Sequence, residues 1–472
     1  MSDRSGFLDG VYDFTLSNLR TLKARWRDFA GEKSAIPTLL TDGDAARLRD
    51  QMQDCLEARG GEVSARARAA ALGRTYLALP AEGRARFLHL LATEFDIDRV
   101  AVAAACQRIA HARSDDEKHR IERALRQALE PPRVKLLTQF NALPNGVKFL
   151  VDMRAELMQL ARHDEALTSL DHDLRGLLAS WFDEGFLEVR RITWDSPAAL
   201  LEKLMFYEAV HEIRGWSDLK NRLEADRRCF AYFHPRMPDE PLIFVEVALV
   251  QGMADNVQSL LDETAPVGDP DTADTAIFYS ISNCQRGLSG ISFGAFLIKR
   301  VADRLAAELP HLTRYATLSP LPGFRSWLDQ RCVEEGDDLL LPTERRAIEV
   351  LPNVPTEHPL TTLLSRPDWY EDPAVAQALK VPLLRLATRY IVNEKSPRGR
   401  ALDSVAHFHL SNGARLERIN WLGDLSPKGL QQAAGLMINY LYRLQDIEEN
   451  HEAYSGEGRV TASQSVLRLL KA

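Results

Sequence analysis

The chain of 472 residues lacks several features that mark common functional classes. It has no excess of positive charge: 59 Lys and Arg residues against 67 Asp and Glu residues give a formal net charge of −8. This balance argues against a protein that binds nucleic acid or an anionic membrane surface, although a local basic patch stays possible. A long hydrophobic run is also missing, because Leu242–Val250 contains Glu246 and is far too short to span a bilayer. We therefore expect no nucleic-acid partner and no membrane partner.

Closely spaced cysteines are absent as well. The five cysteines, Cys55, Cys106, Cys229, Cys284 and Cys332, lie far apart and form no CxxC pair. That spacing fits neither a disulfide framework nor a zinc ribbon, so reduced thiols are expected. The amino-terminal MSDRSGFLDG shows no basic region followed by an apolar stretch, which a secretory signal would need. We predict a cytoplasmic protein.

The first third of the chain has the periodicity of α-helices. Apolar residues recur at helical spacing in RARFLHLLATEF, residues 84–95, and in NGVKFLVDMRAELMQLAR, residues 145–162. The Pro131-Pro132 pair separates the earlier helices from the later one. We predict an all-α domain over residues 1–172 that serves interaction or oligomerisation and carries no chemistry of its own.

After about Leu174 the pattern changes to short segments rich in β-branched and aromatic residues. Four such segments are bounded by proline, glycine or aspartate clusters and predict strands. They are CFAYFHP, LIFVEVALV, TAIFYSIS and YATLSPL, which begin at Cys229, Leu242, Thr275 and Tyr315. A helix is expected from Phe296, in FLIKRVADRLAAEL. These elements predict an α+β fold overall, with a mixed α/β domain over residues 173–472.

Two further elements are expected near the carboxyl end. SVAHFHL and ARLERINW are joined by Ser411-Asn412-Gly413, and Asn-Gly between two such segments predicts a β-hairpin. One long helix is expected after Ser426-Pro427, because serine is a good N-cap and proline fits the first helical turn.

Residues 275–310 are the most informative segment, since they predict a strand, a glycine-rich loop and a helix in succession. Gly287, Gly290 and Gly294 permit positive φ and let the backbone approach a ligand closely. The free N–H groups at the start of the following helix suit an anion. The segment therefore predicts a main-chain cradle for a diphosphate. A glycine-rich connection without a ligand is the alternative.

The same loop also matches a serine-hydrolase motif. Residues 290–294, GISFG, fit G-x-S-x-G, and Asp403 and His409 follow in the chain order of such a triad. Against this, Asn283–Ser289 separate Ser292 from the predicted strand, and no HGGG-like segment precedes it. A serine hydrolase built on Ser292 stays the second hypothesis.

A metal site receives little support from the histidines. If SVAHFHL is a strand, His407 and His409 point to the same face and could be two ligands. No third ligand at zinc-like spacing and no HExxH motif accompanies them. We predict no metal ion, and His211 and His234 receive no role.

Several long blocks, taken together, are similar to one known family. They are FYSISNCQRGLSGISFGAFLIKRV, LSPLPGF and ALDSVAHFHLSNGARLERINWLGDLSPKGLQQAAGLMINYLYRL, with RRITWDSP, YEAVHEI and HPRMPDEPLIFVEVAL upstream. In these blocks, about residues 170–445, the chain resembles the malonyl-CoA decarboxylase family. The resemblance implies a helical amino-terminal domain, a catalytic domain with the fold of the GNAT acetyltransferases, and a homodimer or homotetramer formed through the helical domain.

The resemblance also implies site residues. The catalytic serine of the family lies in an SLSPIPGF-like block and falls on Ser319, and the catalytic histidine lies in an FHL-x-NGA block and falls on His409. Tyr442, near the end of the expected long helix, falls on a substrate-binding tyrosine. Some relatives have a glutamate in place of Ser292, so a shared ion-pair role there is in doubt. The loop that binds malonyl-CoA falls on Ser289, Gly290, Ile291, Ser292, Phe293, Gly294 and Ala295.

The implied chemistry requires neither a metal nor an organic cofactor. Loss of CO2 from malonyl-CoA leaves an enolate whose charge lies largely on the thioester oxygen, and the carbon then needs one proton. The resemblance makes Ser319 the proton acceptor and His409 the proton donor, with coenzyme A as part of the substrate. A GNAT-type acyl-CoA transferase and a non-catalytic acyl-CoA sensor stay as further alternatives, and the presence of both residues favours catalysis.

Overall fold

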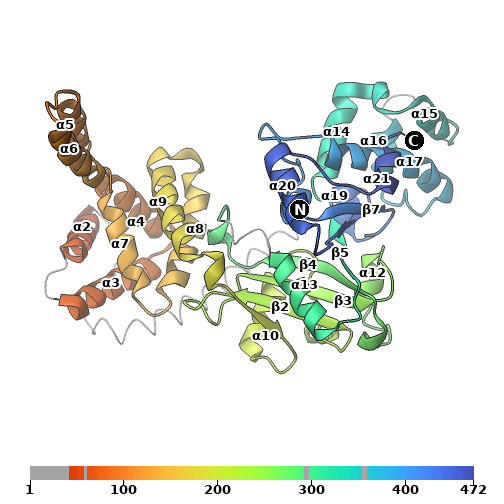
Figure 1. Cartoon of the computed structure of the whole chain (residues 1–472), viewed down its shortest axis with the longest axis horizontal. Helices are drawn as coiled ribbons and strands as arrows, with labels where there is room; N and C mark the ends of the chain where they lie inside the picture. The colour runs from red at the N-terminus through yellow and green to blue at the C-terminus, as the bar shows by residue number, and fades with distance from the viewer. Residues whose placement is uncertain (1–41, 58–60, 292–296, 353, 355–358, 472) are drawn as a thin grey trace. The chain divides into compact units, whose positions relative to one another are not determined.

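The computed structural model describes residues 42–57, 61–291, 297–352, 354 and 359–471 (Figure 1). The chain divides into two compact units. The first consists of residues 1–187, 234–241 and 285–292, and the second of residues 188–233, 242–284 and 293–472. The domain division at residue 172 stays a prediction, and a helix, α9 (Glu165–Trp181), runs across that point.

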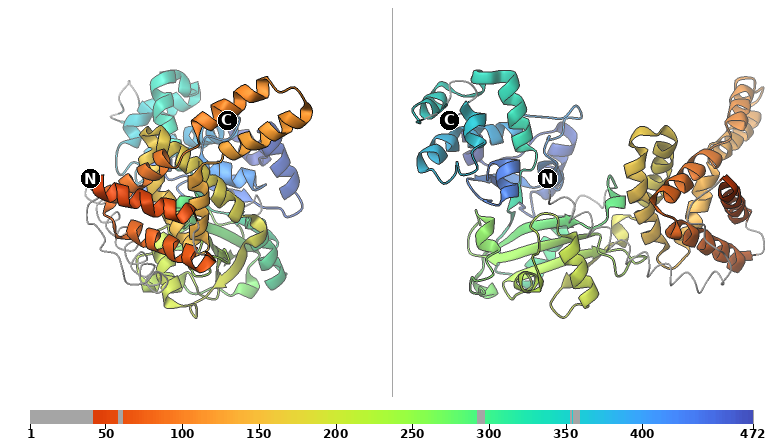
Figure 2. Two further views of the ribbon diagram at one scale, coloured as in Figure 1. Left: turned by 90° about the vertical axis from the view of Figure 1, so that its left-hand side faces the viewer. Right: turned by 180° about the vertical axis from the view of Figure 1, so that it is seen from behind.

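The first unit is built from helices, as the periodicity of residues 84–95 and 145–162 predicts. The antiparallel helices α5 and α6 lie side by side (Figures 1 and 2). The helices are α2 (Asp42–Leu56), α3 (Gly61–Ala78), α4 (Ala81–Glu94), α5 (Arg99–Ala110), α6 (Asp115–Ala128), α7 (Pro132–Asn141), α8 (Gly146–Leu160) and α9, with short 3-10 helices η1 (Ala161–His163), η2 (Glu184–Phe186) and η4 (Arg286–Leu288).

Aromatic residues from four helices form the core of this unit. The ring of Tyr76 contacts Phe87 edge-on at 5.0 Å and Phe149 at 5.6 Å between ring centroids. Phe140 packs on Phe149 at 5.0 Å, and all four residues are buried. Their burial explains why a stripe of apolar residues recurs at helical spacing in this part of the sequence.

The second unit contains an eight-stranded mixed sheet. Its order is β1-β2-β3-β4-β5-β8-β6, with β7 paired to β8 off this path. Strands β4 and β5 are parallel, and the other pairs are antiparallel. The strands are β1 (Glu188–Ile192), β2 (Arg227–Phe233), β3 (Ile243–Val250), β4 (Thr275–Asn283), β5 (Arg314–Thr317), β6 (Ser319–Pro320), β7 (Arg415–Asn420) and β8 (Met437–Leu441).

Helices of the second unit pack on the sheet and beside it. α13 connects the parallel strands β4 and β5, as a crossover between parallel strands requires. None of the helices in the described ranges is long and apolar enough to cross a membrane. The helices are α10 (Ala198–Tyr207), α11 (Trp216–Asn221), α12 (Val257–Leu260), α13 (Leu297–Glu308), α14 (Phe324–Glu335), α15 (Pro342–Glu349), α16 (Pro359–Leu364), α17 (Pro373–Val392), α18 (Ser404–Ser411), α19 (Pro427–Ala433), α20 (Ile447–Glu457) and α21 (Gln464–Leu469), with η3 (Pro270–Thr272) and η5 (Gly336–Leu339).

The predicted hairpin at Ser411-Asn412-Gly413 is wrong in its first half. SVAHFHL forms the helix α18, because the carboxylate of Asp403 caps it by accepting the N–H groups of Val405 at 2.9 Å and Ala406 at 3.0 Å. Gly413, with φ of 78°, follows the end of the helix, as a left-handed glycine commonly does. ARLERINW does form a strand, β7, as predicted.

The long helix predicted after Ser426-Pro427 is also wrong beyond its first two turns. Ser426 caps it through Gly429 N–H at 3.0 Å, and Pro427 occupies its first position, as expected. The helix ends at Ala433, since Ala434 adopts a left-handed φ of 50°. The residues that follow form β8, in which all five side chains are buried. A strand buried on both faces lacks the polar alternation by which strands are recognised in a sequence.

Candidate active site

The structure brings Ser319 and His409 together, although they lie 90 residues apart in the sequence. Ser319 begins the short strand β6, where it pairs with Ile438 of β8, and His409 lies in the last turn of α18. The Ser319 Oγ and His409 Nε2 atoms are 2.9 Å apart. Both residues are buried, with 5% and 2% of their surface exposed. The two predicted catalytic residues therefore form a hydrogen-bonded pair shielded from water.

Asp403 holds the backbone on both sides of this pair. One carboxylate oxygen caps α18, and the other accepts the N–H of Gly323 at 3.0 Å, just after β6. Position 323 has no room for a side chain, because a Cβ there would lie 2.3 Å from the hydroxyl of Tyr390 and 3.3 Å from the Asp403 carboxylate. Burial raises the pKa of Asp403 above its usual value. The carboxylate thus connects the two segments that carry Ser319 and His409.

The imidazole of His409 is enclosed by two tyrosines. Its Nδ1 atom is 2.8 Å from the hydroxyl of Tyr442, and its ring stacks on Tyr440 with 4.6 Å between centroids. Burial lowers the pKa of His409 from 6.5 to about 3, because a charged ring would lose its hydration. The ring is therefore neutral at neutral pH, with a hydrogen on one of its two nitrogens.

Tyr442 lies just after the buried strand β8 and not near the end of a long helix. Its hydroxyl contacts the imidazole nitrogen on the opposite side of the ring from Ser319. Tyr442 is 1% exposed, and burial raises the pKa of its hydroxyl well above its usual value. This geometry suits a group that orients His409.

His407 does not share a face with His409, contrary to the strand-based prediction. Two residues that are two positions apart on a helix point about 200° apart around its axis. His407 Nδ1 instead lies 2.9 Å from the hydroxyl of Tyr454. Across the described ranges of the chain, no cluster of three or more His, Cys, Asp or Glu side chains could hold a metal ion.

The arrangement also disfavours a hydrolase triad of Ser292, His409 and Asp403. The carboxylate of Asp403 accepts three backbone N–H groups, from Val405, Ala406 and Gly323. The ring nitrogens of His409 face Ser319 and Tyr442 instead. Since a triad needs the acid to orient the imidazole, the acid role assigned to Asp403 does not hold.

The predicted substrate loop is described only in its first part, in the first unit. Ser292, Phe293, Gly294 and Ala295 lie outside the described residues, whereas Ser289, Gly290 and Ile291 follow η4. Gly290 has a φ of 76°, a conformation that favours glycine. Gly287 does not have a positive φ, and it lets the chain approach the backbone of α8, because a Cβ there would lie 1.8 Å from the carbonyl oxygen of Val151. Ligand binding by this loop stays a prediction.

Arg154 of α8 anchors the start of this loop. Its Nη1 donates to the carbonyl oxygens of Gly287 at 2.7 Å and Ser289 at 2.9 Å, and its Nε donates to Asp171 at 2.9 Å. Sequence reasoning missed this residue. One feature of the sequence could have indicated it. Arg154 lies four positions after Leu150 and three before Leu157, so it falls on the apolar, buried side of the predicted helix.

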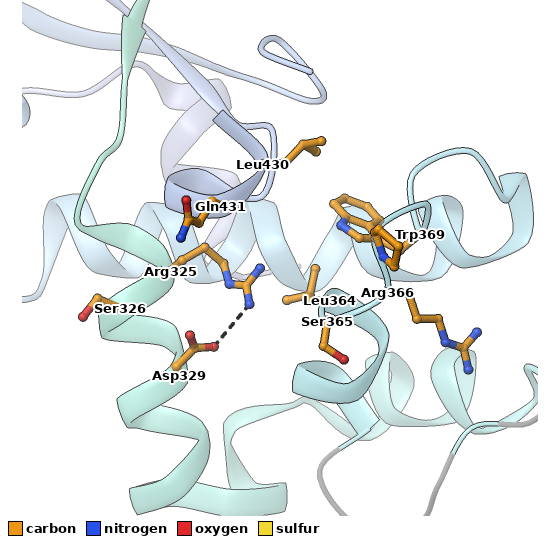
Figure 3. Close-up of a pocket in the computed structure, with 10 residues that line it drawn as sticks. Arg325, Ser326, Asp329, Leu364, Ser365, Arg366, Trp369, Leu430 and Gln431 are labelled. Carbon is orange, nitrogen blue, oxygen red and sulfur yellow. Dashed lines mark hydrogen bonds and ion pairs between the residues drawn. The ribbon is translucent and has the colours of Figure 1, made fainter. Parts of the chain in front are cut away.

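A cavity of about 470 Å³ lies elsewhere in the second unit, between α14, α16 and α19 (Figure 3). The Arg325 side chain points toward Asp329 within it, at 3.5 Å. Neither Ser319 nor His409 lines this cavity, so the cavity is separate from the site of the Ser319–His409 pair. It is lined by Arg325, Ser326, Asp329, Leu364, Ser365, Arg366, Pro367, Trp369, Leu430 and Gln431.

The fold and the pair of Ser319 and His409 indicate the class of the protein. A mixed sheet with the parallel strands β4 and β5, connected through the glycine loop and α13, forms an α+β domain that follows a helical region in the sequence. The buried Ser319 and His409 lie at β6 and α18 of that domain.

Comparison with known proteins identifies the family. Residues 185–472 match the model of the malonyl-CoA decarboxylase C-terminal domain, and residues 95–182 match that of the N-terminal domain. Mitochondrial malonyl-CoA decarboxylase of Anser anser anser is 38% identical over 419 residues, which are 85% of this chain and 82% of the relative. That of Rattus norvegicus is 37% identical over 402 residues, 82% of each chain.

Solved structures agree. The crystal structure of malonyl-CoA decarboxylase from Rhodopseudomonas palustris has a TM-score of 0.82 at 41% identity, and the one from Agrobacterium vitis has 0.81 at 44%. Each comparison covers 90% of this chain and 99% of the other. The chain belongs to the malonyl-CoA decarboxylase family and is an enzyme of the carboxy-lyase class.

Proposed function

We propose that the chain converts malonyl-CoA to acetyl-CoA and CO2 at the pair of Ser319 and His409, without a metal ion or an organic cofactor. The observation that carries the proposal is the 2.9 Å contact between these two buried side chains, which come from distant segments. The relatives and structures named above are malonyl-CoA decarboxylases, which supports the substrate.

The chemistry follows from the electron flow. The bond between the malonyl carboxylate and the neighbouring carbon breaks, its electron pair moves into the thioester as an enolate, and CO2 leaves. One proton then adds to the carbon, so one proton is consumed in each turnover. A buried site strengthens hydrogen bonds to the developing negative charge because water does not compete for them. The thioester itself accepts the electrons, which is why the proposal includes no cofactor.

Ser319 and His409 divide the remaining work in this proposal. The Ser319 hydroxyl hydrogen-bonds the substrate and holds the departing carboxylate at the angle that favours cleavage. His409 is neutral before substrate binds, since burial holds its pKa at about 3. A malonyl carboxylate beside the ring would raise that pKa, because a nearby negative charge favours the imidazolium. Substrate binding thus prepares His409 to donate the proton to the enolate carbon.

We further propose that the segment Ser289–Ala295 contacts malonyl-CoA through its main chain. The left-handed Gly290 and the position of the segment between β4 and α13 support this, because N–H groups at the start of a helix suit a diphosphate. Tyr442 would contribute to substrate binding by holding the imidazole through Nδ1.

The helical domain would mediate a homodimer or homotetramer. A cytoplasmic location stays a prediction, and the curated relatives carry the word mitochondrial in their names.

The test is a product analysis with malonyl-CoA that carries an isotope label in its free carboxylate. Mass spectrometry should find acetyl-CoA and labelled CO2 in equal amounts, and a reaction in heavy water should place one deuterium in the acetyl methyl group. The His409→Gln variant is the matched control and should form little of either product. Release of free coenzyme A and malonate would identify a thioesterase, and transfer of the malonyl group to an added acceptor would identify a transferase. Either result would contradict the proposal.

A further inference from the structure

We propose that Thr317 is a positioning residue that sets the direction of the hydrogen bonds running through Ser319 to His409, so that the imidazole of the substrate-free enzyme carries its hydrogen on Nε2. The inference rests on the proposed function of the pair. It adds a residue to which neither the sequence nor the family resemblance assigns a role.

Thr317 is the last residue of β5 and is fully buried against β8. Its Oγ1 accepts the backbone N–H of Tyr440 at 3.1 Å, and its hydroxyl hydrogen points to the carbonyl oxygen of Ile438 at 3.5 Å. A backbone N–H can only donate and a carbonyl oxygen can only accept. The backbone of β8 therefore favours a Thr317 hydroxyl whose oxygen accepts from Tyr440 and whose hydrogen is turned toward Ile438.

With its hydrogen directed at Ile438, Thr317 has one acceptor site left. Ser319 Oγ fills it by donating to Thr317 Oγ1 at 2.9 Å. A serine hydroxyl has only one hydrogen, so in the substrate-free enzyme, where Thr317 accepts that hydrogen, Ser319 acts only as an acceptor toward other groups. In the proposed reaction the bound carboxylate takes over this hydrogen, and Ser319 still accepts from His409. The hydrogen-bond direction that the β8 backbone sets at Thr317 therefore also sets the direction at Ser319.

The same logic determines the state of His409. Because Ser319 Oγ acts as an acceptor at 2.9 Å from Nε2, the hydrogen of the neutral ring must lie on Nε2. Nδ1 is then the acceptor, and the hydroxyl of Tyr442 donates to it at 2.8 Å. All of the hydrogen bonds from Tyr442 to Ile438 run in one direction, and bonds aligned in this way polarise and strengthen one another.

This direction matters for catalysis. His409 faces Ser319 with a hydrogen rather than a lone pair, which suits a proton donor and opposes activation of Ser319 as a nucleophile. Without the Thr317 hydroxyl, Ser319 could turn its hydrogen toward Nε2, and the imidazole hydrogen would move to Nδ1. In that tautomer Nε2 lacks the hydrogen that His409 donates, so on substrate binding the ring would have to take up its second proton on the side that faces Ser319 and the substrate.

The test compares three variants. Thr317→Val removes the hydroxyl and keeps the shape, and Thr317→Ser keeps the hydroxyl. Thr388→Val is the matched control, because Thr388 is an equally buried threonine of α17 in the same unit whose hydroxyl donates only to the carbonyl oxygen of Leu384 at 2.8 Å. Steady-state kinetics on malonyl-CoA is measured for each, together with the tautomer of His409 from NMR of nitrogen-labelled histidine, assigned by its loss in His409→Gln.

We expect Thr317→Val to lower kcat by about 10²-fold with little change in KM, as when a catalytic imidazole has the wrong tautomer, and to move the His409 hydrogen off Nε2. Thr317→Ser should restore both readouts, and Thr388→Val should leave both unchanged. An unaltered kcat in Thr317→Val, or a lowered kcat with the hydrogen still on Nε2, would overturn the inference. The NMR readout needs no turnover, so it tests Thr317 even if the proposed decarboxylation itself failed.

Discussion

Burial of His409 should make the second unit sensitive to acid, and replacement of this one side chain should remove part of that sensitivity. The pKa of His409 falls from 6.5 to about 3 on folding, because the ring loses its hydration. Between these values the unfolded chain binds a proton that the folded chain does not. The stability contributed by the neutral ring is therefore fully present above pH 6.5 and is lost progressively as the pH falls toward 3.

The size of the effect follows from the two pKa values. Lowering the pH from about 8 to about 5 should cost about 2 kcal/mol of unfolding free energy through this one group. His409→Gln removes the titration and leaves a polar side chain in the site. We expect the variant to be less stable at pH 8 by about 1–3 kcal/mol, since Tyr442 loses its partner, and the difference to shrink by about 2 kcal/mol at pH 5. The pKa of His211, which burial lowers to about 4, affects both proteins equally.

Urea unfolding at a series of pH values measures this difference. Tryptophan fluorescence reports mainly on the second unit because five of the seven tryptophans lie there, at positions 194, 216, 327, 369 and 421. The slope of unfolding free energy against urea should be the same in both proteins, so that midpoints can be compared. Parallel pH profiles for the wild type and His409→Gln would refute the reasoning, since they would mean that the imidazole titrates alike in the folded and unfolded states.

Three further outcomes are expected. Ser319→Ala and His409→Ala should each lower kcat by about 10²-fold or more. The kcat of His407→Ala should stay close to that of the wild type, because His407 contacts Tyr454 and not the pair. An equal loss of kcat in His407→Ala would contradict this. Exhaustive chelation should leave acetyl-CoA formation unchanged, and recovery of lost activity by one divalent ion would disprove the cofactor-free mechanism. Ser292→Ala should mainly alter KM, and a fluorophosphonate should leave the enzyme active, so stoichiometric labelling of Ser292 in a mass spectrum would instead indicate a hydrolase.

Local patterns in the sequence determined much of the fold. The helical stripes of residues 84–95 and 145–162 form α4 and α8, because a helix that packs on one side needs apolar residues at that spacing. Short β-branched segments bounded by turn residues form β2, β3, β4 and β5. The cap at Ser426 was also readable, since capping depends on residues only three positions apart. Resemblance to a family supplied Ser319 and His409.

Other elements depended on contacts that no local pattern contains. SVAHFHL alternates like a strand but becomes α18, because Asp403 both caps it and reaches Gly323, 80 residues earlier. The residues of β8 lack polar alternation, so their sequence predicts part of a helix, yet they form a strand that pairs with β5, β6 and β7 and is buried on both faces. Local propensity is a weak preference, and such tertiary contacts override it.

The working geometry of the site comes from the tertiary structure alone. Ser319 lies in β6, His409 in α18 and Tyr442 just after β8. Only the pairing of β5 and β6 with β8 and the packing of α18 bring their polar atoms within 3 Å. The direction of their hydrogen bonds comes from backbone groups of β8, more than 120 residues after Thr317. The sequence shows which side chains are able to donate or accept a hydrogen bond. Which of them does so depends on the partners that folding places beside it.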